Sequence, residues 1–460
     1  MFRTVIGVVS AWCMIGGGVA ADRDLDPRAF TGWDFIGVQD SADRPKPSQP
    51  SPVIAFVDVN VVPMDSERVL PRQTVLVRNG RIAEMGSKDK VRVPAGAVRI
   101  DGHGKYLIPG LADMHTHLQL ADSTEVERWL RIFVANGVTT IRNMDYLQPS
   151  EFIKQSGPQL LRWRARTAAG EVLGPHIYTS GPLSGVWDQI IGGLQLPVDS
   201  MEKRLTEYKA AGYDFLKVHP GKGGDRFDSL LTIAKRVGVP VVGHVPDDRP
   251  VDSSISPLYK SIEHLFGFSY SAQAPVSEED IPEIVALTKR SHVWICPTEM
   301  LAEMISSQTA TNAAKQWPET QKDYVSESLR KSLWGVVEVG SDSIAEEKIA
   351  VARHLIKALH DAGVGLLLGT DVPAHYQVPG FSVHHELEAL VRAGLTPYQA
   401  LLTGTRNVAE YFGTLKTRGT VAQGKEADLV LLEKNPLTDI RNTTTIAGVM
   451  IGGRWLPSGK

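Results

Sequence analysis

Cysteine is almost missing from this chain, which has 2 cysteines among 460 residues. Cys13 lies inside an apolar N-terminal run, so Cys296 is the cysteine that would remain if this run were removed. A single cysteine excludes an internal disulfide framework. The folded chain must therefore be held together by its core and by any bound ions.

The chain also lacks an excess of charge of either sign. Its formal net charge is -3, and no tract is dense in lysine or arginine. This balance argues against nucleic acid as a partner. A length of 460 residues, 42% of them hydrophobic and 22% charged, is ordinary for a globular protein. That length suffices for two domains or for one barrel with an appendage.

The N-terminus differs from the rest of the chain. Arg3 precedes a mostly apolar run with small residues at its end, which predicts a cleaved signal peptide over residues 1–21. We therefore expect a secreted or periplasmic protein with no stable membrane anchor after cleavage; an uncleaved anchor is the alternative. Residues 22–52 are polar and rich in proline, which predicts an extended lead-in.

Short β-type runs lie on both sides of the middle of the chain. Residues 53–105 contain three such runs, and Asn79-Gly80 between the last two is a strong hairpin signal. We expect this segment to form a small antiparallel sheet. Residues 415–460 repeat the pattern, with Gly452-Gly453 as a turn. We predict that the two terminal segments pair into one small β-sandwich domain.

The middle of the chain alternates strand-like and helix-like stretches. Glycines follow several predicted helices at the position of a C-terminal cap: Gly137, Gly212, Gly238 and Gly363. The alternation predicts an α/β fold, a (β/α)₈ TIM-type barrel over residues 106–414. The stretch from about residue 299 to residue 362 is too long for one crossover between strands, which predicts a helical insertion there. The strand-like runs end near His117, Asn143, Ser180, His219, His244, His264, Pro297 and Asp371.

Two histidines one residue apart end the first predicted strand of the barrel. Because side chains alternate along a strand, His115 and His117 point the same way, which suits two imidazoles that bind one metal ion. Barrel enzymes carry their chemistry at the carboxyl ends of the strands. The residues that fall there are His115, His117, Lys217, His244, His264 and Asp371.

On these residues the chain resembles the amidohydrolase superfamily, and most of all its binuclear branch of imidazolonepropionase-related and prolidase-like enzymes. The resemblance runs from about Val53 to Leu456 and includes the late segment Glu426-Ala427-Asp428-Leu429-Val430. It implies two divalent metal ions. One would be bound by His115, His117 and Asp371, the other by His244 and His264, with Lys217 bridging both.

A lysine that bridges two cations needs a chemical explanation. An ammonium has no lone pair and would be repelled by two dications. The resemblance implies that Lys217 is carboxylated, which makes it an anionic ligand with two oxygen atoms. An unmodified Lys217 would leave a single-metal site. Zinc is the first choice for these ligands, and manganese or cobalt fits them too.

The resemblance further implies a metal-dependent hydrolase that cleaves an amide-type C–N bond. A hydroxide that bridges the metals would attack the carbonyl, and Asp371 would move the proton to the leaving nitrogen. A small-molecule substrate is expected: peptide-like, an N-acyl amino acid or a cyclic amide. Esterase, lactonase or phosphotriesterase activity and a non-catalytic ligand-binding barrel remain alternatives. The sequence leaves homo-oligomer formation open.

Four further residues are candidates for substrate contact or for support of the ligands. They are His219, which shares a face with Lys217, and Arg142, Asn143 and Tyr178, which we place at or near the barrel mouth. Relatives often have Arg-Asp where this chain has Arg142-Asn143, and a Gly-Gly-His segment is missing from residues 185–189. Both departures put in doubt the transfer of any relative's substrate. We give structural roles to Asp113, His176, His292 and Cys296.

Overall fold

The computed structural model describes residues 52–144, 154–181, 198–219, 224–246, 249–265, 276–305, 319–334 and 342–458. The predicted signal peptide, nearly all of the predicted lead-in 22–52 and the segment 185–189 lie outside these ranges. Within them, no helix combines the length and the apolar character needed to cross a membrane.

One eight-stranded sheet contains strands from both terminal segments, and the strand that joins them, β5, lies just after the predicted bound of residue 105. β13 pairs with β5 in antiparallel register, and this pairing joins the C-terminal strands to the N-terminal ones. Buried apolar side chains such as Phe56, Leu107 and Met450 form its core. The strands are β1 (Ile54–Val61), β2 (Leu70–Arg78), β3 (Arg81–Ser87), β4 (Val98–Asp101), β5 (Tyr106–Pro109), β13 (Leu429–Leu432), β14 (Ile446–Ile451) and β15 (Arg454–Pro457).

The hairpin prediction is confirmed, but the prediction of a purely antiparallel N-terminal sheet is wrong. Asn79 and Gly80 connect β2 to β3 with φ angles of 50° and 73°, the left-handed values that this turn needs. β1 pairs in parallel with both β4 and β5. The chain after β3 crosses back before each of these strands, so both run in the direction of β1.

The middle of the chain forms two parallel sheets in a mixed α/β fold. Isolated parallel bridges extend the pairing from Ser180 to Phe215, from Ile295 to Leu366 and from Thr116 to Val372. The pairing therefore continues in chain order from β6 to residues 366–372 and returns to β6. The sheets contain β6 (Leu111–Thr116), β7 (Val138–Asn143) and β8 (His176–Thr179), and then β9 (Leu216–Val218), β10 (Val241–Gly243), β11 (Tyr259–Glu263) and β12 (Trp294–Cys296).

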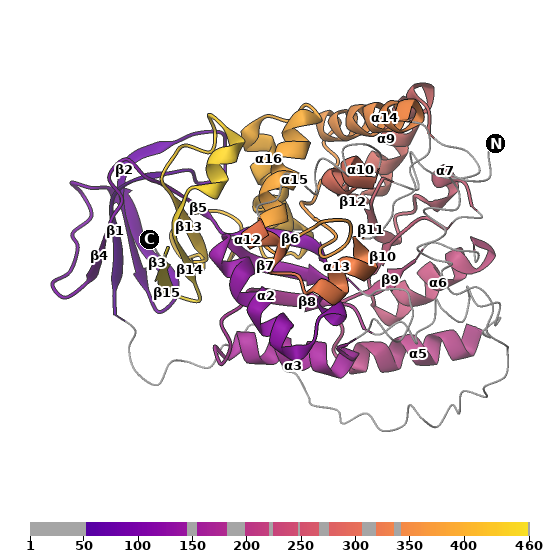
Figure 1. Ribbon diagram of the computed structural model, residues 1–460, viewed down its shortest axis with the longest axis horizontal. Coiled ribbons are helices and arrows are strands. Elements are labelled where there is room, and N and C mark those ends of the chain that lie inside the picture. Colours follow the sequence, from indigo (N-terminus) through magenta and orange to yellow (C-terminus); the bar gives the residue numbers. More distant parts are fainter. Residues whose placement is uncertain are drawn as a thin grey trace.

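Helices surround these parallel strands, and the eight-stranded sheet lies at one end of the molecule (Figure 1). The four predicted glycine caps are confirmed, since Gly137, Gly212, Gly238 and Gly363 all have φ between 79° and 88°. The longer helices are α2 (Ser123–Ala135), α3 (Gly157–Ala168), α5 (Val198–Ala210), α6 (Gly224–Val237), α9 (Ile281–Ser291), α14 (Asp342–Asp361) and α15 (Phe381–Arg392). The shorter ones are α7 (Val251–Ser254), α10 (Glu299–Ile305), α12 (Glu319–Lys322), α13 (Glu327–Leu333), α16 (Pro397–Thr403) and α17 (Arg406–Tyr411).

The described parts of the expected insertion, residues 299–305, 319–334 and 342–362, are largely helical. The middle part lies between α2 and the loop that follows the last parallel segment. The indole of Trp129 donates to the Tyr324 carbonyl at 2.8 Å, and the indole of Trp334 donates to the Pro373 carbonyl at 2.9 Å. Residues 319–334 are thus attached at both ends, and one attachment is two residues from Asp371.

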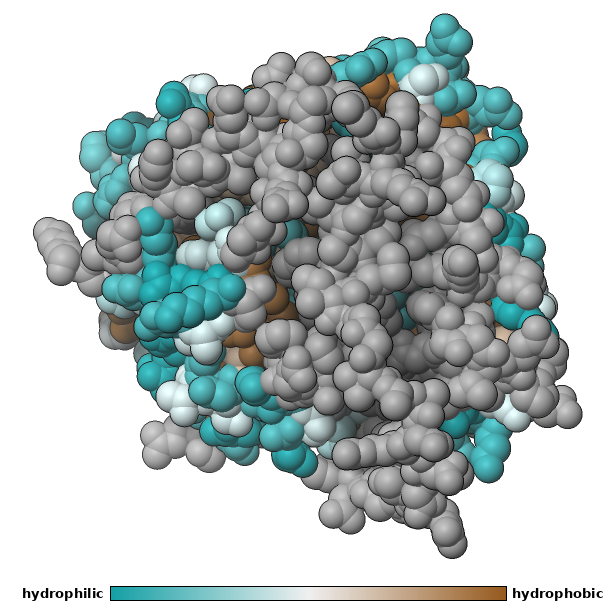
Figure 2. All heavy atoms as spheres, turned by 45° about the vertical axis from the view of Figure 1, so that its right-hand side comes forward, coloured by the Kyte–Doolittle hydropathy of each residue, from teal (hydrophilic) through white to brown (hydrophobic). Residues whose placement is uncertain are grey.

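Large apolar side chains are buried throughout the described part of the molecule. The surface in Figure 2 is mostly hydrophilic where it is coloured, with small hydrophobic areas between polar side chains. Among the described residues, Val98 is the large hydrophobic residue that is exposed, at 46%. Any functional site must therefore be sought among buried polar groups rather than on an apolar patch.

Candidate metal centre

The six predicted ligands are buried or nearly buried and gather at the carboxyl ends of the parallel strands. His117 Nε2 lies 2.8 Å from Asp371 Oδ1, and His115 Nε2 lies 3.1 Å from the same oxygen. The His264 ring is 4.5 Å from the His115 ring and 4.8 Å from the His244 ring. Lys217 Nζ lies 3.1 Å from His115 Nε2. Side chains in or just after four strands, β6, β9, β10 and β11, therefore meet the side chain of Asp371 in one place.

The backbone is unusual where these residues emerge. Asp371 and His264 have φ angles of 69° and 61°, and Thr298, after β12, has 49°. Residues other than glycine rarely adopt such values, and they cluster at functional sites. Gly243 has φ 130°, and a Cβ there would lie 2.1 Å from the Val218 carbonyl oxygen. Only glycine fits this approach of β10 to β9, directly before His244.

Three of the imidazoles are held by a hydrogen bond at Nδ1. His115 Nδ1 faces Glu263 at 3.1 Å, His117 Nδ1 faces the Met144 carbonyl at 2.9 Å, and His264 Nδ1 faces Thr298 Oγ1 at 2.7 Å. Nδ1 of His117 faces the amide nitrogen of Gln119 at 3.1 Å as well as the Met144 carbonyl. The Glu263 carboxylate only accepts, so Nδ1 of His115 donates and its Nε2 atom carries the lone pair. This is the arrangement in which metal-binding histidines are commonly held.

Burial keeps His115, His244 and His264 neutral. It lowers the pKa of His264 to about 3; the negative charge of Asp371 opposes this effect and the positive charge of Lys217 adds to it. Burial and then Lys217 also lower the pKa of His115 and of His244 well below the usual range. Burial raises the pKa of Asp371, but the hydrogen bond from His117 and nearby positive charges outweigh it, so the pKa is lowered. The cluster therefore offers neutral imidazoles and a carboxylate.

These donors fit a metal ion. The Nε2 atoms of His115 and His117 lie 3.1 and 2.8 Å from the same oxygen of Asp371, so two imidazole nitrogens and one carboxylate oxygen converge on one point. The ligand atoms of His115, His117 and Asp371 all lie within 4.8 Å of one another. Nitrogen and carboxylate oxygen donors in a buried site suit zinc or a similar divalent ion.

Two of the four candidates for substrate contact or support of the ligands pack against other side chains. Arg142 is fully buried, with its guanidinium on both carboxylate oxygens of Glu263 at 2.7 and 2.6 Å, so it does not face the mouth, and its contacts agree with support of the ligands through Glu263. Tyr178 stacks on Phe412 at 3.6 Å and lines a small hollow that also includes Gly110, which directly precedes β6.

The other two candidates lie beside the cluster. Asn143 accepts from Leu118 N at 2.7 Å and donates to Thr179 Oγ1 at 3.2 Å, so it supports the backbone after His117. His219 is 4% exposed, and its ring is 6.0 Å from the His244 ring. Their predicted roles, either in contact with substrate or in support of the ligands, stay predictions.

Sequence reasoning missed Glu263, which directly precedes His264 in β11 and is 1% exposed. A signal was present, because a glutamate inside an apolar strand is rarely buried without a partner. Thr298 was also missed. No local pattern identifies it, since its contact with His264 spans 34 residues.

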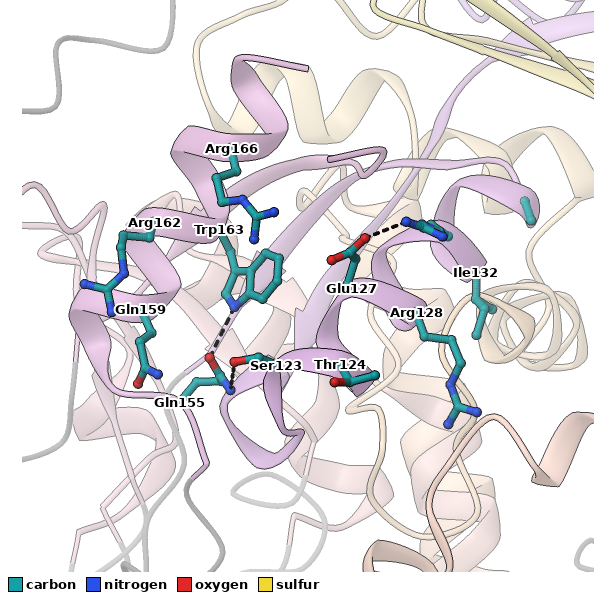
Figure 3. A pocket seen from close by; sticks show the side chains of 12 residues that line it. Ser123, Thr124, Glu127, Arg128, Ile132, Gln155, Gln159, Arg162, Trp163 and Arg166 are labelled. Atoms are coloured by element: carbon teal, nitrogen blue, oxygen red, sulfur yellow. Dashed lines mark hydrogen bonds and ion pairs between the residues drawn. The ribbon is translucent and has the colours of Figure 1, made fainter. Parts of the chain in front are cut away.

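A larger hollow on the outer surface does not belong to the cluster. This cavity of about 880 Å³ lies between α2 and α3 and is lined by four arginines, Arg128, Arg131, Arg162 and Arg166 (Figure 3). None of the predicted site residues lines it. The indole nitrogen of Trp163, which also lines this cavity, donates to Gln155 Oε1 at 3.2 Å, and Arg131 forms an ion pair with Glu127.

Comparison with known proteins assigns the family. The Amidohydrolase family matches residues 106–456. An adenine deaminase from Ligilactobacillus salivarius is 23% identical over 363 residues, which cover 78% of this chain and 51% of that protein. The chain thus spans about half the length of this relative. Imidazolonepropionase from Shouchella clausii is 25% identical over 418 residues, or 79% of this chain and 80% of that protein.

The solved structures include prolidase-like proteins with the same fold. One from Bifidobacterium longum has a TM-score of 0.68 and 23% identity, and the match covers 90% of this chain and 97% of that one. The family match spans the parallel strands, their helices and the strands that follow them. The chain therefore belongs to the amidohydrolase family.

Proposed function

We propose that this protein is a binuclear metal-dependent hydrolase that cleaves an amide-type C–N bond in a small molecule. The observation that carries this proposal is that neutral imidazoles, the Asp371 carboxylate and the Lys217 amine lie together in a buried cluster. In it, His115 and His117 direct their Nε2 atoms at one carboxylate oxygen. Membership of the amidohydrolase family supports it as well.

In this proposal His115, His117 and Asp371 would hold one ion, and His244 and His264 would hold the other. Lys217, carboxylated to a carbamate, would be a ligand to both. Burial, partly offset by Glu263 and Asp371, lowers the pKa of Lys217 to about 8, so part of the amine is neutral near pH 7. A neutral amine has the lone pair that addition of carbon dioxide requires. Zinc is the first choice of ion.

Asp371 moves the proton in the proposed reaction. Divalent ions bound there would supply Lewis-acid polarisation of the substrate carbonyl and a water whose pKa is lowered toward ~7. Asp371 is ionised, its side chain is 14% exposed, and His117 fixes one of its oxygens, so the carboxylate can accept the proton of the attacking water. It then donates this proton to the departing nitrogen, because an amide nitrogen leaves poorly unless it is protonated.

We propose a peptide-like or N-acyl amino acid substrate, with a cyclic amide as the next choice. The loop after Asp371 carries Tyr376, whose ring is 5.5 Å from that of Trp334 in the segment 319–334. This aromatic pair would give the site an apolar side. Relatives named imidazolonepropionase and prolidase-like support an amide-type bond in a small substrate.

The fold that we propose for this chemistry is a closed (β/α)₈ barrel over residues 106–414 with a β-sandwich built from residues 53–105 and 415–460. The parallel bridge between Thr116 and Val372 supports closure, since it pairs the last parallel segment with the first strand. A closed barrel would bring the carboxyl ends of all strands to one rim.

The proton-transfer role is tested with Asp371→Asn. The amide oxygen can still bind metal but the side chain cannot carry a proton, so turnover should fall by about 10²- to 10⁴-fold with near-normal metal content. Asp361→Asn, at an exposed pair with Lys357 on α14, is the control and should keep full activity. Full activity of Asp371→Asn would refute the role.

The bridge is tested with Lys217→Ala, which should lose at least one of two ions by elemental analysis. Retention of both ions would remove Lys217 as the bridge. Rates on an amide and on the ester of the same acid separate amide hydrolysis from esterase activity. Hydrolysis of neither, with ions bound, would favour a binding protein.

A further inference from the structure

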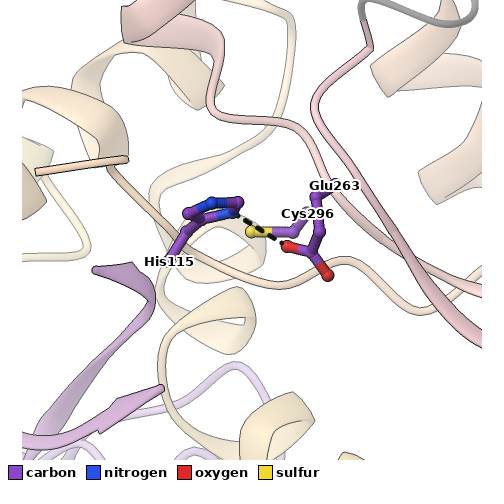
Figure 4. A group of neighbouring side chains, drawn as sticks. All are labelled: His115, Glu263 and Cys296. Carbon is purple, nitrogen blue, oxygen red and sulfur yellow. Dashed lines mark hydrogen bonds and ion pairs between the residues drawn. The ribbon is translucent and has the colours of Figure 1, made fainter. Parts of the chain in front are cut away.

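Glu263 contacts the side of the His115 ring that faces away from Asp371. Figure 4 shows its carboxylate on one side of this ring with the Cys296 thiol beside it, and the three ligand atoms lie within 4.8 Å of one another. The Nδ1–Oε2 distance is 3.1 Å, and the side chains of both His115 and Glu263 are 0% exposed. A fully buried carboxylate thus contacts Nδ1 of His115, the ring nitrogen on the far side from the predicted metal position.

Arg142 holds this carboxylate in place. It donates from Nη2 to both oxygens of Glu263, from Nε to the Met114 carbonyl at 2.7 Å and from Nη1 to the hydroxyl of Tyr411 at 2.9 Å. Ser261 donates to Glu263 as well, at 2.5 Å. Charge-assisted hydrogen bonds from Arg142 Nη2 and the hydroxyl of Ser261 together hold the carboxylate in position.

The buried carboxylate of Glu263 faces a buried guanidinium. Burial opposes a charge on Arg142, but the facing carboxylate of Glu263 outweighs it, and the pKa of Arg142 is raised. Arg142 therefore stays a cation. The Glu263 carboxylate accepts the proton of His115 Nδ1, which leaves the lone pair of His115 on Nε2.

Close packing restricts the same ring from another side. A Cβ on Gly369, in the last parallel segment, would lie 2.5 Å from Cys296 Sγ and 3.0 Å from His115 Cβ. Because glycine lacks this atom, the backbone of that segment can lie directly against His115 and Cys296. The imidazole therefore has little room to tilt.

We propose that Glu263, held by Arg142, is a positioning residue that fixes the Nδ1–H tautomer of His115 and aims Nε2 at the metal centre. This inference rests on the proposed function in one respect, namely that His115 is a metal ligand. In this proposal Arg142 binds Glu263 and does not contact the substrate. A carboxylate behind a ligating histidine also makes that histidine a stronger ligand.

The test compares zinc affinity, measured by competition with a chromophoric chelator, in folded variants of the full chain. Glu263→Gln should weaken zinc binding by about 10- to 100-fold, because an amide can present either an oxygen or an NH₂ group to Nδ1. It also leaves the buried Arg142 cation without a counter-charge, which destabilises the fold. The pair Arg142→Met with Glu263→Gln removes both charges and is the second variant.

Glu299→Gln is the matched control. Glu299 is 1% exposed and is paired with Arg353 at 3.1 Å, but no contact of its side chain reaches an imidazole of the cluster in the described part of the chain. It should lose stability while zinc affinity stays unchanged. Wild-type zinc affinity in either folded Glu263 variant would overturn the positioning role.

A second measurement separates this inference from the proposed function. In ¹⁵N-histidine spectra of wild-type protein, His115, assigned by the loss of its signals in His115→Asn, should carry its proton on Nδ1. An Nε2–H form would overturn the role of Glu263 even if zinc binds. An Nδ1–H form in a protein that binds no zinc and hydrolyses no amide would support the role of Glu263 and refute the proposed function.

Discussion

Two groups of histidine and carboxylate residues lie at different places along the parallel strands, and simple proximity does not tell them apart. At the carboxyl ends, the ligand atoms of His115, His117 and Asp371 are within 4.8 Å of one another. His176, at the start of β8, forms an equally compact group with Glu426 and Asp428 near β13. Distance alone would make both of them metal sites.

Their surroundings differ. His176 Nε2 is bound to Asp428 at 2.8 Å, and Glu426 is paired with Arg418 at 2.8 Å and with Arg81 at 3.6 Å. Cations of the chain thus already face the carboxylate of Glu426, and this group joins the terminal sheet to the α/β region. In the other group, the hydrogen bond from His115 Nδ1 to Glu263 leaves the Nε2 lone pair of His115 directed at a carboxylate. Anchored lone pairs, rather than proximity, indicate a metal centre.

The largest expected effect comes from removing one histidine of each group. His117→Ala should lower metal affinity by more than about 100-fold and abolish hydrolysis, because it removes a ligand rather than a supporting residue. His176→Ala should cost about 1–2 kcal/mol of stability through the lost hydrogen bond to Asp428 and leave metal content unchanged. Elemental analysis and urea unfolding of both variants measure this. Metal loss in His176→Ala would erase the distinction.

His384 is buried outside both groups, and the pH dependence of stability tests whether burial of a histidine alone distinguishes a metal ligand from a structural residue. Burial, and then the charge of His385, lower the pKa of His384 from 6.5 to about 4. Its contribution is fully present above pH 6.5. As the pH falls from there through 4, the unfolded chain binds a proton that the native residue does not, so stability drops by up to about 3 kcal/mol.

His384→Asn should therefore flatten the fall in unfolding free energy between pH 7 and the acid side, while metal content at pH 7 stays that of the wild type. Parallel urea titrations of both proteins measure the difference. Identical pH dependence in the two proteins would show that burial of His384 has no such consequence. If instead the expected result is obtained, a buried histidine can affect stability without any metal-binding or catalytic role.

The smallest effect is expected at the paired carboxylate of the second group. Glu426→Gln removes the charge that faces Arg418, and both side chains are partly exposed, at 23% and 20%. Solvent screens such a pair, so stability should change by less than about 1 kcal/mol, with unaltered turnover. Thermal melts and steady-state rates check this. A large fall in activity would link this group to catalysis.

Much of the fold could be predicted because it depends on local patterns. The Asn79-Gly80 turn and the four glycine caps follow from backbone conformations that glycine and asparagine adopt readily. The parallel pairing of β1 with β4 could not be predicted, because strand direction depends on where a loop returns. Arg142 was misplaced for a related reason. The position of a residue along a strand does not say what its side chain meets across the interior.

The sequence by itself determined the alternation of strands and helices and placed His115, His117, Lys217, His244, His264 and Asp371 at strand ends, because periodicity and turn residues act over a few positions. Only the tertiary structure decided that Glu263 orients His115, that Arg142 is the partner of Glu263 and that Thr298 holds His264. These contacts join residues 148, 121 and 34 positions apart. Hydrogen bonds over such separations form only when the packed strands bring both groups together in a space without water, and no local pattern encodes that meeting.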